Sequence, residues 1–195
     1  AQRRILNYSL SYSTERKQFG VSINTFGAIR KKLAEMATGA FVSEAGSYRG
    51  AKDVENKIEE LVAGGMNHEE AELKGVEEFA VECSILKVFV SDLAQHSADE
   101  GIQIFGGMGF SEDTPMESAW RDSRISRIYE GTNEINRLLA VGMLIKRTMQ
   151  GKIDLLTPAK NVGKELMGIP SFDIPDYSEY MSEEKEVIKN LKKVF

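Results

Sequence analysis

The fold of this 195-residue chain is decided by the stretch FGAIRKKLAEMATGA, residues 26–40. Its apolar residues return every three or four positions, at Phe26, Ile29, Leu33, Met36 and Ala40. This spacing places them on one face of an α-helix, whereas alternation at every second position would indicate a strand. The stretch therefore predicts a long amphipathic helix that packs along one face.

The same spacing recurs in three later stretches of the chain. It appears at Ala51, Val54, Ile58 and Leu61, at Phe79, Cys83, Leu86, Val90, Leu93 and Ser97, and at Ile135, Leu138, Gly142, Ile145 and Met149. Gly64-Gly65 separates the first two of these runs, and strand-like alternation is absent from the sequence. Stripes near a 3.5-residue repeat predict an all-α chain that folds as an antiparallel, up-down four-helix bundle.

Small residues in the first helical stretch predict close contact with a neighbouring helix. They are Ala37, Gly39, Ala40, Ala45 and Gly46. Because small side chains let two helix backbones approach, we expect this face to pack tightly within the bundle. A single apolar stripe covers only part of each helix, so a subunit interface is expected in addition to the core.

The composition limits the kinds of function that this chain can have. Hydrophobic residues make up 42% and charged residues 28%, as in ordinary globular domains, and the net charge of -5 argues against a nucleic-acid surface. The single cysteine, Cys83, excludes an internal disulfide framework, and its place in an apolar stripe predicts a core residue. His68 and His96 have no ligand-like spacing, so no metal site is expected.

Residues 151–195 differ in character from residues 1–150. Glycines and prolines interrupt the helical pattern at Gly151, Pro158, Gly163, Gly168, Pro170 and Pro175. An amphipathic helix follows, with Ser182 as its expected N-cap. We therefore expect a bundle domain over 1–150 and a partial C-terminal extension over 151–195, consisting of a linker and the start of a further helical module. Both ends of the chain look cut from a longer polypeptide.

A candidate catalytic carboxylate lies in the segment RDSRISRIYEGTNEINR, residues 121–137. Glu130 follows several arginines and precedes Gly131 and Thr132, which predict a turn. On a turn between helices, a carboxylate can project into a cavity where burial and neighbours tune a general base. The alternative is a solvent-facing Glu130 beside a helix-breaking Gly131, and chemistry alone favours this alternative.

Two further motifs combine polar side chains with glycines. The segment ERKQFG, residues 15–20, places two cations beside a glycine and suits a pyrophosphate, although basic residues also end many helices. The segment QIFGGMGF, residues 103–110, would let a ligand approach the backbone closely, but it lacks the strand context of a dinucleotide fingerprint. Each motif alone is weak.

Taken together and in this order, the motifs resemble the C-terminal helical domain of the acyl-CoA dehydrogenases. The segments RKQFG, QIFGGMGF and RDSRI with IYEGTNEI carry the resemblance, which runs from Ala1 to about residue 150. The helix pair around Gly64-Gly65 and the C-terminal extension look most like the very-long-chain branch. Glu130 itself argues against relatives that place the base on another helix.

The resemblance implies a flavoenzyme that oxidises a saturated acyl-CoA to the trans-2-enoyl-CoA. Glu130 would remove the α proton while the β hydrogen leaves as hydride to N5 of FAD. Hydrogen bonds to the thioester carbonyl, one of them from the backbone N–H of Glu130, would stabilise developing enolate character. Tyr129 and Gly131 would line the site for the acyl group.

The same resemblance implies which residues contact FAD. One turn would reach the flavin of a neighbouring subunit, a second segment would hold the adenosine part across an interface, and a third would bring a helix N-terminus to the diphosphate. In chain order these residues are Arg16, Lys17, Gln18 and Phe19; Gln103, Ile104, Phe105, Gly106 and Gly107; and Gly131, Thr132, Asn133 and Glu134. At Gly27 the family often has a polar residue, so no flavin contact is expected there.

Two other functions share parts of this pattern. A non-enzymatic assembly module would keep the bundle and its oligomerisation but would not need the flavin motifs. An acyl-CoA oxidase would share the bundle and the base but would let oxygen reach the reduced flavin. Flavin content tests the first alternative, and hydrogen peroxide production tests the second.

The resemblance also sets expectations about partners and location. We expect an acyl-CoA substrate, an electron-transfer flavoprotein as acceptor, and a homodimer or homotetramer in a bacterial cytoplasm or a mitochondrial matrix. In the family, an N-terminal helical domain and a middle β domain precede this bundle, so the chain alone is expected to be inactive. Membrane association has no firm basis, because its only hint lies beyond Pro158.

Overall fold

The computed structural model describes residues 1–168 and 177–194, and the chain divides into two units, Ala1–Met143 and Leu144–Phe195. Helix α7 (Asn133–Met149) crosses this division, and each unit is described here by itself. Pro170, Pro175 and Phe195, which the sequence assigned to the extension, lie outside the described residues. Within the described ranges, no helix is both long enough and apolar enough to cross a bilayer.

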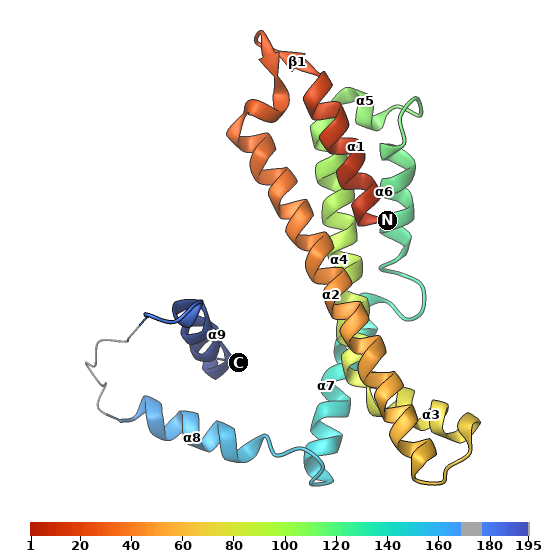
Figure 1. Cartoon of the computed structure of the whole chain (residues 1–195), viewed down its shortest axis with the longest axis vertical. Coiled ribbons are helices and arrows are strands. Elements are labelled where there is room, and N and C mark those ends of the chain that lie inside the picture. The colour runs from red at the N-terminus through yellow and green to blue at the C-terminus, as the bar shows by residue number, and fades with distance from the viewer. Residues whose placement is uncertain (169–176, 195) are drawn as a thin grey trace. The chain divides into compact units, whose positions relative to one another are not determined.

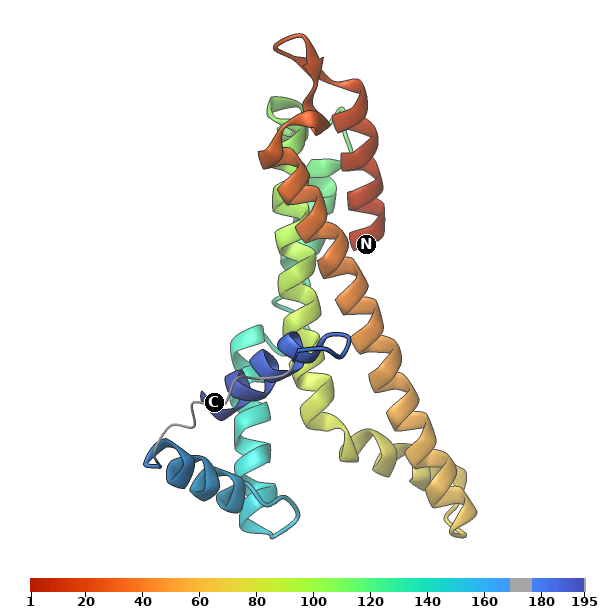
Figure 2. The same cartoon turned by 60° about the vertical axis from the view of Figure 1, so that its left-hand side comes forward.

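Four helices form the bundle of the first unit, which also contains two further α-helices and the start of α7. The bundle helices are α1 (Gln2–Glu15), α2 (Gly27–Ala63), α4 (Ala80–Phe105) and α6 (Met116–Ile125). Successive members run in opposite directions, and α4 packs against the other three (Figure 1, Figure 2). This arrangement confirms the predicted all-α fold and its up-down order. The membership differs, because the runs at 26–40 and 51–61 both lie on α2, and α6 takes the place expected for the run at 135–149.

The buried face of α2 follows the predicted stripe. Leu33, Met36, Ala40 and Ser43 are buried at intervals of three and four residues, which matches helices packed at a shallow angle. The helix ends where the glycine pair was expected to end it, because Gly65 has a φ of 94°. Helix α3 (His68–Glu78) then turns back and packs on α2.

The buried face of α4 lies beside the predicted stripe. Its buried residues include Val81, Ser84, Val88, Ser91 and Ala98. Cys83, expected in the core, is exposed, so that prediction was wrong. The buried face passes through Val81, Ser84 and Val88, and Cys83 lies about 100° around the helix from Ser84.

Close packing between α2 and α4 depends on the small residues that the sequence singled out. A Cβ placed on Gly46 would lie 2.9 Å from Cδ2 of Leu86, and one on Gly39 would lie 3.5 Å from Cδ2 of Leu93. At Gly46 this separation is shorter than real Cβ contacts allow. The two leucines therefore occupy space that larger residues on α2 would fill, which confirms the predicted close approach.

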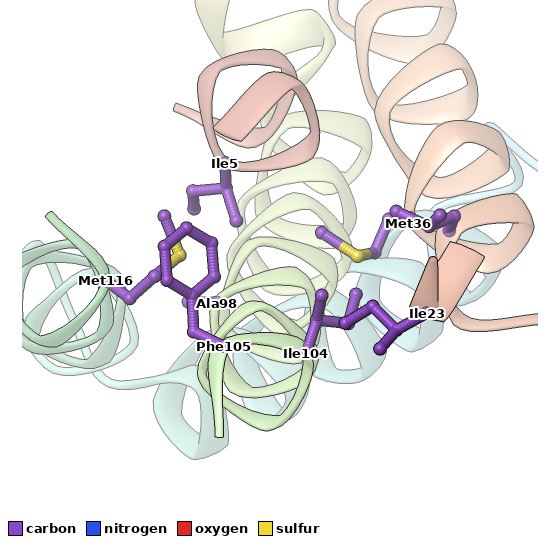
Figure 3. Close-up of a cluster of buried hydrophobic side chains, with 8 residues drawn as sticks. Ile5, Ile23, Met36, Ala98, Ile104, Phe105 and Met116 are labelled. Carbon is purple, nitrogen blue, oxygen red and sulfur yellow. The ribbon is translucent and has the colours of Figure 1, made fainter. Parts of the chain in front are cut away.

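The core of the first unit gathers side chains from every helix of the bundle (Figure 3). It contains Ile5, Ile23, Leu33, Met36, Ala98, Ile104, Phe105 and Met116. Tyr12 of α1 stacks on Phe105 of α4 with ring centroids 4.0 Å apart, and its hydroxyl donates to the Phe105 carbonyl at 3.2 Å. This contact joins the end of α1 to the end of α4.

Helix α7 leaves its predicted apolar stripe uncovered in this chain. Ile135, Leu138, Ile145 and Met149 are all exposed, and 75% of the Leu138 surface is accessible. Its buried residues are Asn133, Asn136 and Ala140. The prediction that the stripe forms bundle core was therefore wrong, because two hydrogen-bonding amides occupy the buried side of α7 instead.

The second unit contains the helices α8 (Leu156–Leu166) and α9 (Ser182–Val194). An ion pair between Lys193 and Glu165 links them. Helix α9 begins at Ser182 itself, and the Ser182 hydroxyl has no hydrogen-bond partner. Ser182 therefore does not act as the N-cap that the sequence suggested.

We expect Gly109→Ala to destabilise the chain. Gly109 is buried in the short helix α5 (Gly107–Phe110), and an added Cβ would lie 2.6 Å from the backbone oxygen of Ile102. Because the backbone must move to admit it, the free energy of unfolding should fall by about 1–3 kcal/mol in urea titrations. Gly142→Ala is the matched control, since nothing lies within 4 Å of its added Cβ. A Gly109→Ala chain as stable as this control would contradict the analysis.

Candidate functional site

The turn that carries Glu130 has an unusual backbone. Glu130 has a φ of 56° and Gly131 a φ of 80°, so both residues lie in the left-handed region between α6 and α7. Glycine adopts this conformation freely, but a glutamate there costs about 1–3 kcal/mol. Contacts from the surrounding structure must therefore hold the turn in place.

Asn136, in the first turn of α7, supplies one set of these contacts. Its Nδ2 donates to the Gly131 carbonyl at 2.8 Å and lies 3.2 Å from the Thr132 carbonyl and 3.4 Å from that of Glu130. The Asn136 side chain is buried, with only 8% of the residue exposed. One amide group thus gathers three consecutive carbonyls of the turn.

Lys87 supplies the second set of contacts from α4. Its Nζ donates to the Gly131 carbonyl and to Oδ1 of Asn133, each at 2.8 Å. Lys87 is partly buried in the stretch ILKVFV, residues 85–90, whose other side chains are apolar. A lysine at this position therefore reaches across from one helix to fix the loop before another.

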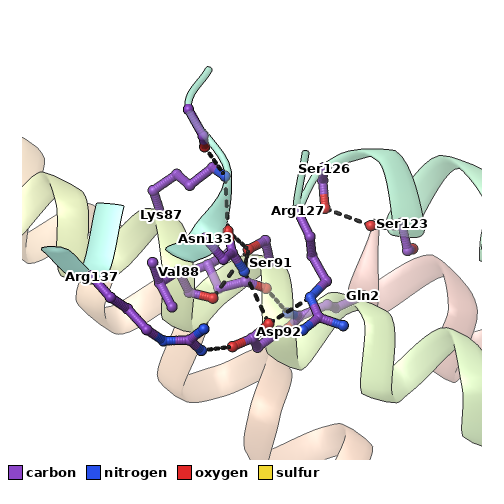
Figure 4. A network of polar contacts seen from close by, with 12 residues as sticks. Gln2, Lys87, Val88, Ser91, Asp92, Ser123, Ser126, Arg127, Asn133 and Arg137 are labelled. Atoms are coloured by element: carbon purple, nitrogen blue, oxygen red, sulfur yellow. Dashed lines mark hydrogen bonds and ion pairs between the residues drawn. The ribbon is translucent and has the colours of Figure 1, made fainter. Parts of the chain in front are cut away.

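Asn133 and Asp92 extend these contacts into a network (Figure 4). The Asn133 Nδ2 donates to Oγ of Ser91 at 2.9 Å and to Oδ1 of Asp92 at 3.0 Å. Asp92 also forms ion pairs with Arg127 and Arg137, both at 2.7 Å. Residues before and after the Glu130 turn are thereby bound to the same carboxylate of α4.

Thr132 caps the start of α7 and helps to lower the pKa of the nearby Glu134. The Ile135 backbone N–H donates to Oγ1 of Thr132 at 3.3 Å, as in a helix N-cap. The pKa of Glu134 is lowered chiefly by its own backbone N–H and by the Thr132 hydroxyl, with smaller contributions from Arg137 and Arg127. The start of α7 therefore favours negative charge, as helix N-termini do.

The predicted base, Glu130, and the preceding residue, Tyr129, lie in different surroundings. Glu130 is exposed in this chain, so the side chain is not enclosed as a general base would be. Tyr129, which is 49% exposed, lines a pocket of about 370 Å³ between α1 and α6. Tyr8 of α1 and Ser123 of α6 also line it, and Glu130 is not among its lining residues.

The first predicted cofactor motif forms a hairpin. Strand β1 (Lys17–Gln18) pairs antiparallel with β2 (Val21–Ser22), a local strand pair that the sequence did not predict. Arg16, Lys17 and Gln18 are exposed, and Phe19 is 93% exposed at the turn. Phe19 and Gly20 both have positive φ, which closes the two-residue turn.

The second predicted cofactor motif divides between surface and core. Gln103, Gly106 and Gly107 are exposed, whereas Ile104 and Phe105 are buried in the bundle core. Gly106 has a φ of 62°, and nothing lies within 4 Å of a Cβ built on it. The backbone is therefore open to a ligand at this point, while the two apolar side chains anchor the end of α4.

The structure brings two of the three motifs together. The hairpin and α5 lie at the same end of the first unit (Figure 1), next to the contact of Tyr12 with Phe105. The Glu130 turn instead contacts α4 at Lys87, which is 18 residues before Phe105. At 1.5 Å per residue the two places are roughly 27 Å apart along the helix.

Sequence reasoning missed Lys87, Asp92 and Asn136. A lysine inside an apolar helical run was a usable signal for Lys87, because a cation there requires a partner. Asn133 and Asn136 are three residues apart at a helix start and therefore lie on the same helix face, which was a usable signal for Asn136. Nothing local pointed to Asp92, whose partners come from later segments of the chain.

Comparisons with known proteins agree on one family. The family model described as "Acyl-CoA dehydrogenase, C-terminal domain" matches residues 1–144. The chain is 35% identical to a probable acyl-CoA dehydrogenase of Bacillus subtilis (strain 168), over 100% of this chain and 32% of that protein. It is 36% identical to the human mitochondrial very long-chain specific acyl-CoA dehydrogenase, over 87% of this chain and 21% of that protein.

A solved structure is similar over almost the whole chain. It is an acyl-CoA dehydrogenase complexed with FAD from Bacillus anthracis, with a TM-score of 0.90 and 36% identity. The match covers 99% of this chain and 32% of that one. The chain therefore spans a third or less of the length of these relatives.

We expect the stability contributed by Glu134 to depend on pH. Because its pKa is lowered in the folded state, this contribution is present above the ordinary value of 4.5 and is lost as the pH falls through the lowered pKa. Glu134→Gln should therefore reduce the free energy of unfolding at neutral pH, and the difference should shrink in acid. Glu112→Gln, outside any helix, is the control, and an equal pH dependence in both variants would refute the assignment.

Proposed function

The chain belongs to the acyl-CoA dehydrogenase family, and we propose that it works as the C-terminal domain of an FAD-dependent enzyme that oxidises saturated acyl-CoA to trans-2-enoyl-CoA. The observation that carries this proposal is the backbone of the Glu130 turn. A left-handed glutamate, held by a buried asparagine and a lysine, is a costly feature that a plain loop does not need.

In this proposal Glu130 takes the α proton of the thioester. A carboxylate is suited to this step because the developing enolate is stabilised at the same time by hydrogen bonds to the carbonyl. The Glu130 backbone N–H would supply one of these bonds, so the conformation of the turn would align both the base and the donor. Bound FAD supplies flavin N5 as the acceptor of the hydride from the β carbon.

The exposed parts of the predicted cofactor motifs fit a dinucleotide. Gly106 leaves the backbone open, Gln103 can donate and accept hydrogen bonds, and Arg16 with Lys17 can pair with a pyrophosphate. Phe19 adds an exposed aromatic ring at the hairpin tip. Because these groups lie roughly 27 Å along α4 from the Glu130 turn, one chain would contact two different FAD molecules.

That distribution supports a homodimer or homotetramer in which the hairpin and Gln103–Gly107 reach the FAD of a neighbouring subunit. Ile104 and Phe105, which are buried, would take part only through their backbone. Thr132 and Glu134 would approach the diphosphate of the other FAD at the start of α7. Asn133 is buried and its side chain is already hydrogen-bonded to α4, so it would hold this helix start in place. The Glu134 side chain would have to move away from this helix N-terminus, because its carboxylate accepts hydrogen bonds there from its own backbone N–H and from the Thr132 hydroxyl.

The acyl group would lie beside Tyr129 and Gly131. Tyr129 contributes to the pocket of about 370 Å³ between α1 and α6, whose other lining includes Ile5 and Ala119. Arg4, Asp122 and three serines also line the pocket, so only part of its wall is apolar and suited to an alkyl chain. Residues 1–150 would form the bundle domain, and residues 151–195 a linker and the start of a further helical module. An electron-transfer flavoprotein would accept the electrons, in a bacterial cytoplasm or a mitochondrial matrix.

We expect Glu130→Gln to abolish flavin reduction in the full-length enzyme that carries this chain. Under anaerobic conditions, a long saturated acyl-CoA should bleach the oxidised flavin band of the wild type. The variant should bind the acyl-CoA but bleach at least about a hundredfold more slowly, because the amide cannot accept the proton. Equal bleaching would place the base elsewhere. Hydrogen peroxide formed at the rate of turnover would favour an acyl-CoA oxidase.

The isolated 195-residue chain should neither retain FAD stoichiometrically nor turn over acyl-CoA. The chain spans only 32% of the probable Bacillus subtilis acyl-CoA dehydrogenase and of the Bacillus anthracis structure, and we expect the rest of such a protein to supply the other side of the cofactor site. Absorbance of the purified chain after incubation with FAD measures retention. Full flavin content and turnover would contradict this prediction. A full-length protein without flavin would favour a non-enzymatic assembly module.

A further inference from the structure

Lys87 is a partly buried lysine whose hydrogen bonds go to the loop before α7 and to the first residue of that helix. Over residues 1–168 and 177–194, its Nζ forms no ion pair, and Asp92 further along α4 is already engaged by Arg127 and Arg137. The lysine instead directs its donors at two oxygens, the Gly131 carbonyl and Oδ1 of Asn133. A partly buried cation is therefore bound by the segment that immediately follows Glu130.

Packing alone does not account for a lysine at this position. Lys87 lies between the apolar Leu86 and Val88 in the chain, and the buried Ser84 and Ser91 lie about one turn away on the same helix face. Methionine would fill a similar volume without the cost of removing a cation from water. What methionine lacks is a donor for the Gly131 carbonyl. Asn136 donates to the same oxygen from α7, so donors from two helices converge on one peptide group.

We propose that Lys87 is a positioning residue for the catalytic base, acting with Asn136 by clamping the Gly131 carbonyl and thereby fixing the left-handed conformation of Glu130. The proposal rests on the function proposed for Glu130. The peptide group of Gly131 is the next one in the chain after Glu130, so its orientation limits where the glutamate side chain and N–H can point. Lys87 itself touches neither substrate nor cofactor.

The test uses the full-length enzyme and four variants. Lys87→Met removes the donors and keeps the volume, Lys87→Arg keeps charge and donors, and Lys87→Gln keeps a donor on a shorter side chain. Lys52→Met, on the exposed surface of α2, is the control for loss of one lysine. Anaerobic flavin bleaching by a saturated acyl-CoA gives a limiting rate and a half-saturating concentration for each variant.

We expect Lys87→Met to lower the limiting rate about 10- to 100-fold, with the half-saturating concentration changed less than about threefold, because misplacement of the base affects chemistry rather than binding. Lys87→Arg should recover most of the rate. Lys52→Met should match the wild type. If Lys87→Met bleaches as fast as Lys52→Met, or if affinity falls as much as the rate, the proposal is overturned.

Backbone hydrogen exchange provides a second readout that does not need activity. The Asn133 amide, which donates to the Arg127 carbonyl at 3.1 Å, should exchange about tenfold faster in Lys87→Met while amides of α1 stay unchanged. If Lys87→Met does not fold, Lys87→Gln replaces it and should give intermediate values. If the wild type fails to bleach, the proposed function fails. Faster exchange at Asn133 then still supports the clamp, and unchanged exchange refutes it.

Discussion

The arrangement around Glu130 depends on the buried amide of Asn133. Only 1% of this residue is exposed, and its two side-chain atoms are bound by Lys87, Ser91 and Asp92 from a single helix. A buried amide left without partners would cost about 1–3 kcal/mol, so α7 cannot slide along α4 without a penalty. The amide therefore fixes the register of the helix whose start carries the candidate base.

Because Asn133 and Asn136 form the buried side of α7, the apolar residues of this helix lie on its exposed face. A helix that hydrogen-bonds through Asn133 and Asn136 directs its apolar residues, such as Ile135 and Leu138, away from α4. Polar contacts in a buried position tend to specify one geometry more than they add stability. In this chain, the hydrogen bonds of Asn133 and Asn136 order the Glu130 turn, and the apolar residues of α7 remain uncovered.

The sequence predicted those features that depend on local pattern. The stripe on α2 and its end at Gly65 follow from helical spacing and from the backbone freedom of glycine. The position of Cys83 and the hairpin at Lys17 were not predictable in this way. Burial on α4 depends on three neighbouring helices, and the hairpin depends on a two-residue turn with positive φ at Phe19. The motifs identified Glu130, but Lys87, one of the two residues that hold its turn, lies 44 residues before Gly131.

The exposure of Glu130 limits how this chain alone can work. A carboxylate becomes a stronger base when it is removed from water, and nothing within the first unit removes Glu130 from water. What the bundle does supply is a fixed direction, because Lys87, Asn133 and Asn136 hold the backbone on both sides of the turn. The bundle therefore fixes the backbone of Glu130. In the reaction proposed for this turn, the desolvation of the carboxylate would come from whatever covers it, including the acyl chain itself.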